Sequence, residues 1–186
     1  MKNEKLRVVS EEELQEMIKL YFTERVYRPT AVGMLYRDRK LLLVNSARGD
    51  SWAFPQGGIP RGRTMFDSLG EELWEELGID IGRDPSNLKD VSSFSNTFFI
   101  EELIHPNTRT SGLPKGNAQG KAYFAAAARY VGDPSQVVLN KEEVKAYDLF
   151  DLRTAEKYIK SHNSPDKVRI TLEIIGIFKD RLESDL

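Results

Sequence analysis

Hydrophobic and polar residues follow two different periods along this chain. Short apolar runs, each bounded by Gly, Pro or polar residues, predict strands, and the polar residues 37–39 between the first two runs favour a hairpin. Two stretches rich in Gly, Pro and polar residues, 46–63 and 106–120, predict loops, and we expect the second loop to be mobile. The predicted strands are 30–36, 40–45, 91–101, 121–131 and 144–150.

The start of the chain has the apolar spacing of a helix. We expect residues 1–28 to form a helical extension, opened by a capping pattern at Ser10. Leu14, Ile18 and Tyr21 share one face of this helix. That face needs a cover, which either the rest of the chain or a second subunit of a homodimer would supply.

Three further helices are predicted, at 64–77, 153–161 and 165–182. The first begins with a capping pattern at Thr64 and ends before Gly78, which suits a left-handed cap. Strands mixed with helices predict an α/β sandwich. We expect one domain, residues 29–186, behind the N-terminal extension.

Composition removes several kinds of chemistry. The 186 residues include two histidines and no cysteine. Because there is no cysteine, thiolate nucleophiles, disulfides and zinc–cysteine sites are excluded. The formal charge of −2 provides no general field for wrapping nucleic acid. No apolar run approaches the ~20 residues of a membrane span, and no signal peptide is visible, so we expect a cytoplasmic protein without a membrane partner.

The helix at 64–77 carries the most information. Its apolar residues form one stripe, and Glu72, Glu75 and Glu76 cluster on an adjacent face because residues three and four apart are neighbours. Residues 64–82 contain no Lys or Arg to balance six acidic residues. The stripe consists of Phe66, Leu69, Leu73 and Leu77.

An ordinary acidic helix face is solvated, and that remains the alternative interpretation. Here the carboxylates repel one another and lie near the end of a helix, where the helix dipole disfavours anions. A divalent cation would offset both effects, and oxygen ligands favour Mg²⁺ or Mn²⁺. The preceding glycines, Gly57 and Gly58, permit close approach of the backbone, whose carbonyl could complete a metal site.

Loop and helix together resemble the Nudix box, G-x5-E-x7-R-E-U-x-E-E-x-G-U, where U is a bulky aliphatic residue. Counted back from Glu75-Glu76-Leu77-Gly78-Ile79, the box begins at Gly57. The resemblance implies that Glu72, Glu75 and Glu76 bind metal, with Gly57 beside them. It also implies the Nudix-type α/β/α sandwich with a mixed sheet, here with an N-terminal helix and C-terminal helices.

Two positions depart from the box. The first Glu of the family is Arg63 here, and the Arg of the family is Glu71. Both signs are reversed together, so we expect Arg63 and Glu71 to attract each other as the family's pair does. The alternative is a degenerate box that has lost catalysis.

Segments outside the box are similar to bacterial RNA pyrophosphohydrolases and dinucleoside polyphosphate hydrolases. These segments are 27–29, 52–59, 116–124 and 143–147. The resemblance implies a Mg²⁺-dependent (or Mn²⁺-dependent) pyrophosphohydrolase acting on a dinucleoside polyphosphate or an RNA 5′-triphosphate end. Alternatives are a nucleotide-sugar or nucleoside-triphosphate pyrophosphatase and a non-catalytic nucleotide-binding domain.

The same resemblance suggests roles for single residues. It implies that Glu75, Glu76 and Glu143 are the catalytic carboxylates and that Arg28, Lys121 and Tyr123 contact the substrate. The alternatives are that Glu143 is an ordinary surface residue and that Tyr123, as an aromatic residue in a strand, packs in the core. Further phosphate-binding candidates are Arg48, Arg61 and Lys115, and further stacking candidates are Phe98, Phe99 and Tyr147.

Overall fold

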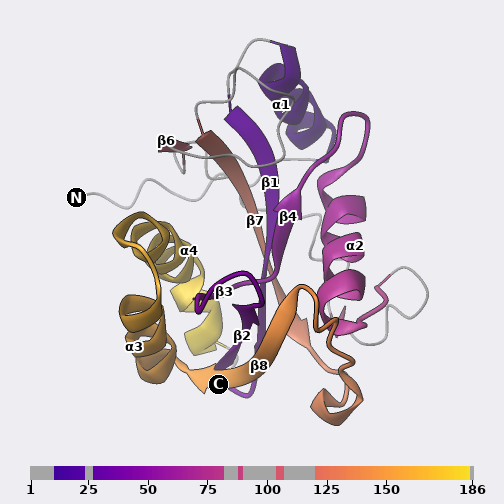
Figure 1. Ribbon diagram of the computed structural model, residues 1–186. Helices are drawn as coiled ribbons and strands as arrows, with labels where there is room; N and C mark the ends of the chain where they lie inside the picture. Colours follow the sequence, from indigo (N-terminus) through magenta and orange to yellow (C-terminus); the bar gives the residue numbers. More distant parts are fainter. Residues whose placement is uncertain (1–10, 24–26, 82–87, 90–103, 107–119, 185–186) are drawn as a thin grey trace.

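A sheet lies between two layers of helices in the computed structural model of this chain (Figure 1). The structure describes residues 11–23, 27–81, 88–89, 104–106 and 120–184. Helices α1 (Glu11–Thr23) and α2 (Met65–Leu77) pack on one face of the sheet. Helices α3 (Leu152–His162) and α4 (Pro165–Ser184) pack on the other face. The predicted α/β sandwich is therefore confirmed.

The sheet is mixed. Its central path runs in the order β3-β2-β1-β7-β5, with β4 pairing to β1, β6 to β7 and β8 to β2. Only β1 and β7 are parallel among the pairs described, and all other described pairs are antiparallel. The strands are β1 (Tyr27–Arg37), β2 (Lys40–Ser46), β3 (Trp52–Ala53), β4 (Gln56–Gly58), β5 (Leu88–Lys89), β6 (Ile104–Pro106), β7 (Gly120–Tyr130) and β8 (Val144–Asp151).

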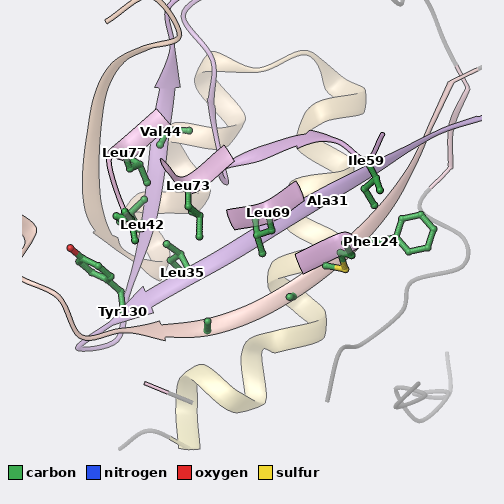
Figure 2. Close-up of a cluster of buried hydrophobic side chains, with 14 of the residues drawn as sticks. Ala31, Leu35, Leu42, Val44, Ile59, Leu69, Leu73, Leu77, Phe124 and Tyr130 are labelled. Atoms are coloured by element: carbon green, nitrogen blue, oxygen red, sulfur yellow. The ribbon is translucent and has the colours of Figure 1, made fainter. Parts of the chain in front are cut away.

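Alternation along the strands divides the core into two clusters. Ala31 and Leu35 of β1 face α2, whereas Val32 and Met34 face the helices of the other layer. Figure 2 shows the first cluster, with the leucines of α2 against Leu35 and Leu42 of the sheet. The predicted stripe is thus the buried face of α2, with Leu69, Leu73 and Leu77 at 0% exposure.

The N-terminal helix belongs to this core. Leu14, Ile18 and Tyr21 are buried against the domain, and the ring of Tyr21 meets that of Phe124 edge-on with 5.6 Å between the centroids. The chain itself therefore covers the apolar face of α1. No helix in the described ranges has the length and apolar character needed to cross a membrane.

The boundaries of several elements differ from the sequence-based expectations. Tyr27 and Arg28, expected in the helical extension, begin β1 because they pair with Gly120 and Lys121 and because Pro29 favours extended backbone before it. The predicted loop 46–63 contains β3 and β4, which form only through pairing with β2 and β1.

The second predicted loop also begins and ends differently. Pro106 closes β6 and pairs with Gly120, the first residue of β7. The interior of that loop and the strand predicted at 91–101 lie outside the described residues. The hairpin turn is confirmed, with Asp38 and Arg39 both at positive φ, as the primed turns of tight hairpins require.

Candidate active site

Local caps fix the two ends of α2, and its buried stripe fixes which way the acidic face points. The Thr64 hydroxyl accepts a hydrogen bond from the Asp67 amide at 2.9 Å, and Gly78 caps the other end in the left-handed conformation. The buried stripe then holds the helix in one rotation against the sheet. Glu72, Glu75 and Glu76 consequently lie at a cleft that Arg28, near the start of β1, also lines.

These three glutamates line a cleft of about 490 Å³. Glu143, which immediately precedes β8, reaches the same cleft and is half-buried. Basic side chains come from β1, β7 and α4, so the cleft contains both signs of charge. Its polar and charged lining residues are Arg28, Ser46, Arg48, Ser51, Gln56, Glu72, Glu75, Glu76, Lys121, Glu143 and Lys167.

The two adjacent glycines of β4 each accommodate a charged side chain. A Cβ built on Gly57 would lie 1.5 Å from Oε1 of Glu72, and one built on Gly58 would lie 2.1 Å from Nη2 of Arg28. No side chain fits at either position without displacing its neighbour. The glycines therefore bring one carboxylate and one guanidinium directly against the backbone of β4.

Burial and mutual repulsion raise the pKa values of two of the carboxylates to near neutral pH. Burial, reinforced by the charges of Glu75 and Glu143, raises the pKa of Glu72 to about 7. Burial, with the charges of Glu72, Glu143 and Glu75, raises the pKa of Glu76 to about 8. Such a cluster stores unfavourable electrostatic free energy that a bound cation would relieve.

A divalent cation fits these residues. Oε2 of Glu76 is buried and has no hydrogen-bond partner. The glutamates around it offer oxygen ligands, which Mg²⁺ and Mn²⁺ prefer. In the part of the chain that the structure describes, no three acidic or histidine side chains already stand as a metal-binding group. We therefore expect glutamate side chains to turn when an ion binds.

Four basic residues line the same cleft as the glutamates, namely Arg28, Arg48, Lys121 and Lys167. Arg28 and Lys121 are register partners on the parallel strands β1 and β7, so their side chains share one face of the sheet. Burial and the charges of Arg28 and Lys167 lower the pKa of Lys121. Nζ of Lys167 donates a hydrogen bond to Oγ of Ser51 at 2.9 Å.

Sequence reasoning missed Lys167 and Ser51. Lys167 stands in the first turn of α4 among polar residues and has the pattern of an ordinary surface lysine. Only the fold, which packs α4 across the sheet from α2, places it at the cleft. No local signal could have identified it.

Arg63 and Glu71 form an ion pair, with Nη1 and Oε1 2.6 Å apart. Both side chains are about half exposed, and neither lines the cleft. The reversed charges of the box therefore do meet. The pair joins the residue before the Thr64 cap to the second turn of α2.

Two aromatic residues expected at the substrate lie elsewhere. Tyr123 is 6% exposed and packs in the core beneath α3 and α4, where burial raises the pKa of its phenol to about 12. Alternation along β7 places it beside Lys121, whose Nζ is 6.0 Å from the ring centroid. Tyr147 packs against the other core cluster and donates its hydroxyl hydrogen to the Pro134 carbonyl.

The remaining phosphate-binding and stacking candidates divide into two groups. Arg48 lines the cleft, whereas Arg61 lies at a different cavity beside α1. Phe98, Phe99 and Lys115 lie outside the described residues.

Curated proteins named RNA pyrophosphohydrolase are similar to parts of this chain. The protein from Bartonella bacilliformis is 30% identical over 100 residues, which cover 54% of this chain and 54% of that protein. The protein from Helicobacter pylori strain 26695 is 25% identical over 131 residues, covering 69% and 74%. The chain thus spans about half the length of the Bartonella relative.

Solved structures and a family model extend the comparison. The E. coli dihydroneopterin triphosphate pyrophosphohydrolase superposes with a TM-score of 0.52 at 21% identity, covering 81% of this chain and 99% of that one. A UDP-X diphosphatase gives 0.53 at 18% identity, covering 93% and 73%. At these identities the structures show a shared fold. The model of the NUDIX domain matches residues 26–169, and the chain therefore belongs to the NUDIX domain family.

Proposed function

We propose that this protein is a divalent-metal-dependent pyrophosphohydrolase. It cleaves a phosphoanhydride bond in a nucleoside diphosphate linked to a further group. Residues 29–186 form the hydrolase domain in this proposal. The observation that carries the proposal is the meeting of four glutamates and several cations in one cleft, Glu72, Glu75, Glu76 and Glu143 facing Arg28, Lys121 and Lys167.

The acidic and the basic residues of the cleft have different roles in this proposal. Glu72 and Glu76, with the raised pKa values, are the residues that would hold Mg²⁺ or Mn²⁺, beside the backbone of Gly57. When bound, the ion supplies positive charge at the phosphate oxygens and makes a nearby water more acidic. Arg28, Lys121 and Lys167 bind phosphates on the other side, which orients the scissile bond.

Two carboxylates are placed to accept the proton of the attacking water. Glu75 is on the exposed side of the α2 cluster, and Glu143 approaches from the segment before β8. Each therefore reaches the cleft from a different element. Replacing each with Gln and measuring the pH dependence of kcat separates them, because loss of the base removes the acidic limb of the profile.

We propose a substrate with a chain of phosphates on a nucleoside, namely a dinucleoside polyphosphate or an RNA 5′-triphosphate end. Several cations beyond the carboxylates suit a chain of phosphates. The relatives named RNA pyrophosphohydrolase support the RNA end. The formal charge of −2 favours recognition of an end over long contacts along an RNA strand.

The experiment is a substrate panel with Mg²⁺ and a metal-free control. Diadenosine tetraphosphate, a short 5′-triphosphorylated RNA, a nucleotide sugar and a nucleoside triphosphate would be compared by release of phosphate, pyrophosphate or mononucleotide. Preference for either of the first two supports the proposal. Preference for the nucleotide sugar or the triphosphate would replace the substrate class, and binding without turnover would indicate a non-catalytic domain.

A further inference from the structure

A second cavity lies between α1 and the turn that leads into α2. It encloses about 310 Å³, within the size range of small-molecule sites. None of its lining residues lines the acidic cleft. Figure 1 shows α1 beside this turn. Helix α1 contributes Gln15, Ile18, Lys19, Phe22 and Thr23, and the turn contributes Arg61, Gly62 and Arg63.

The turn presents two guanidinium groups to this cavity. The Arg63 amide donates to the Pro60 carbonyl at 3.1 Å, and Gly62 has φ +83°, which is typical of the third residue of a type II turn. Arg61 and Arg63 on either side of that glycine both line the cavity. Lys19 adds a third positive charge from α1.

These cations are available to an anion. Within the described residues Arg61 has no ion-pair partner, whereas Lys19 pairs with Glu16 and Arg63 with Glu71. Both pairs are exposed, and exposed ion pairs are weak enough to exchange for a ligand anion. The cavity therefore offers up to three positive charges to one group.

Besides the three cations, the lining consists of Ile18, Phe22 and Gly62 and the polar residues Gln15 and Thr23. Ile18 and the half-buried Phe22 form an apolar wall. The side-chain amide nitrogen of Gln15 is buried and donates to no acceptor in the described structure. A buried donor without an acceptor is unfavourable, and a ligand oxygen or ring nitrogen in the cavity would satisfy it.

We propose that this cavity binds a small phosphorylated ligand with a planar apolar body, the chemistry of a nucleoside monophosphate. Arg61, Lys19 and Arg63 hold the phosphate. Ile18 and Phe22 contact the base, and Gln15 donates to an acceptor on the ligand. This site goes beyond the proposed hydrolase activity and does not depend on it.

Calorimetric titration of the full chain with AMP, in EDTA, tests the proposal. We expect saturable binding with a Kd below about 1 mM, with adenosine and inorganic phosphate each at least about tenfold weaker. The exchanges Arg61→Glu and Lys19→Gln should each weaken AMP binding by about tenfold or more. Lys40→Glu, which makes the same change of charge as Arg61→Glu on the exposed hairpin, should leave it unchanged.

Three results would overturn the proposal. The first is no AMP binding up to about 5 mM, which is weaker than a specific site of this size should give. The second is AMP binding that survives Arg61→Glu but is lost in Lys121→Ala, which would place AMP in the acidic cleft. The third is inorganic phosphate binding as tightly as AMP, which would show that the planar part of the ligand adds nothing to binding. Arg61 and Lys19 are exposed, so unchanged melting temperatures should accompany both of their substitutions.

Discussion

The Glu72 carboxylate lies against the backbone of Gly57, so closely that a methyl group on that glycine would overlap it. The overlapping atoms belong to the end of a flexible side chain, which can move aside. Gly57→Ala should therefore fold normally but displace Glu72. Because small misplacements of catalytic groups cost up to about 100-fold in rate, we expect kcat/KM to fall by about 10- to 100-fold.

The matched control is Gly49→Ala. A Cβ on Gly49 meets no atom within 4 Å, so this variant should keep full activity. Equal activity in Gly57→Ala and Gly49→Ala would show that the position of Glu72 does not matter for turnover. Thermal melting of both variants checks that any loss at Gly57 arises in a folded protein.

The ion pair between Arg63 and Glu71 predicts a coupled effect of two charge reversals. Arg63→Glu restores the usual residue of the box but leaves Glu71 unpaired beside further carboxylates. We expect Mg²⁺ affinity or turnover to fall by about 2- to 5-fold, in keeping with a coupling under ~1 kcal/mol for an exposed pair. Adding Glu71→Arg should recover most of the loss, and effects that simply add would show that the two residues are independent.

The raised pKa values of Glu72 and Glu76 predict that the metal-free protein loses stability as the pH rises. These carboxyls titrate at about 7 and 8 in the folded protein, against an ordinary value of 4.5. Between pH 4.5 and about 8 the folded state binds more protons than the unfolded state. The free energy of unfolding therefore falls with increasing pH across this window.

Denaturant unfolding in EDTA at several pH values measures this fall. Glu76→Gln carries no titrating group at that position, so its stability should decline less steeply, by at least about 1 kcal/mol over the window. The same decline in the variant and the wild type would show that the pKa of Glu76 is not raised in the folded protein. Added Mg²⁺ should raise the stability of the wild type most at the high end of the range, where the carboxylates are ionised.

Burial of α1 predicts that this helix stabilises the whole domain. Leu14 is 0% exposed in the core, whereas Leu20 on the same helix is 38% exposed. Leu14→Ala should lower the free energy of unfolding by about 2–5 kcal/mol. Leu20→Ala should change it by less than about 0.5 kcal/mol, and equal effects of the two substitutions would show that α1 is not part of the cooperative core.

Helix α2 could be predicted from the sequence because its determinants are local. The cap at Thr64, the leucine stripe and the left-handed Gly78 all lie within or next to the helix. Strands β3 and β4 could not be predicted in this way. They are only two and three residues long, and they exist only through pairing with strands that are distant from them along the chain or on the far side of a turn.

In the candidate site, too, some residues could be predicted from local signals, and others are positioned only by the fold. The glutamates of α2 could be recognised from their spacing, and Glu143 from its resemblance to a known segment. Lys167 could not, because only the tertiary packing of α4 brings it to the cleft. The position of Tyr123 could not be decided from the sequence, because the pattern of an aromatic residue in a strand is the same whether the residue contacts a ligand or packs in the core. In the structure Tyr123 packs in the core.

The proposed function requires that the glutamates of α2 support a metal-dependent hydrolysis. Glu76→Gln tests it most directly, because the substitution preserves the shape of the side chain and removes only its charge. On the best substrate of the panel, with saturating Mg²⁺, the account predicts that kcat/KM falls by about 100-fold or more, since loss of a metal ligand costs several kcal/mol of transition-state stabilisation. Turnover within about twofold of the wild type would contradict the account.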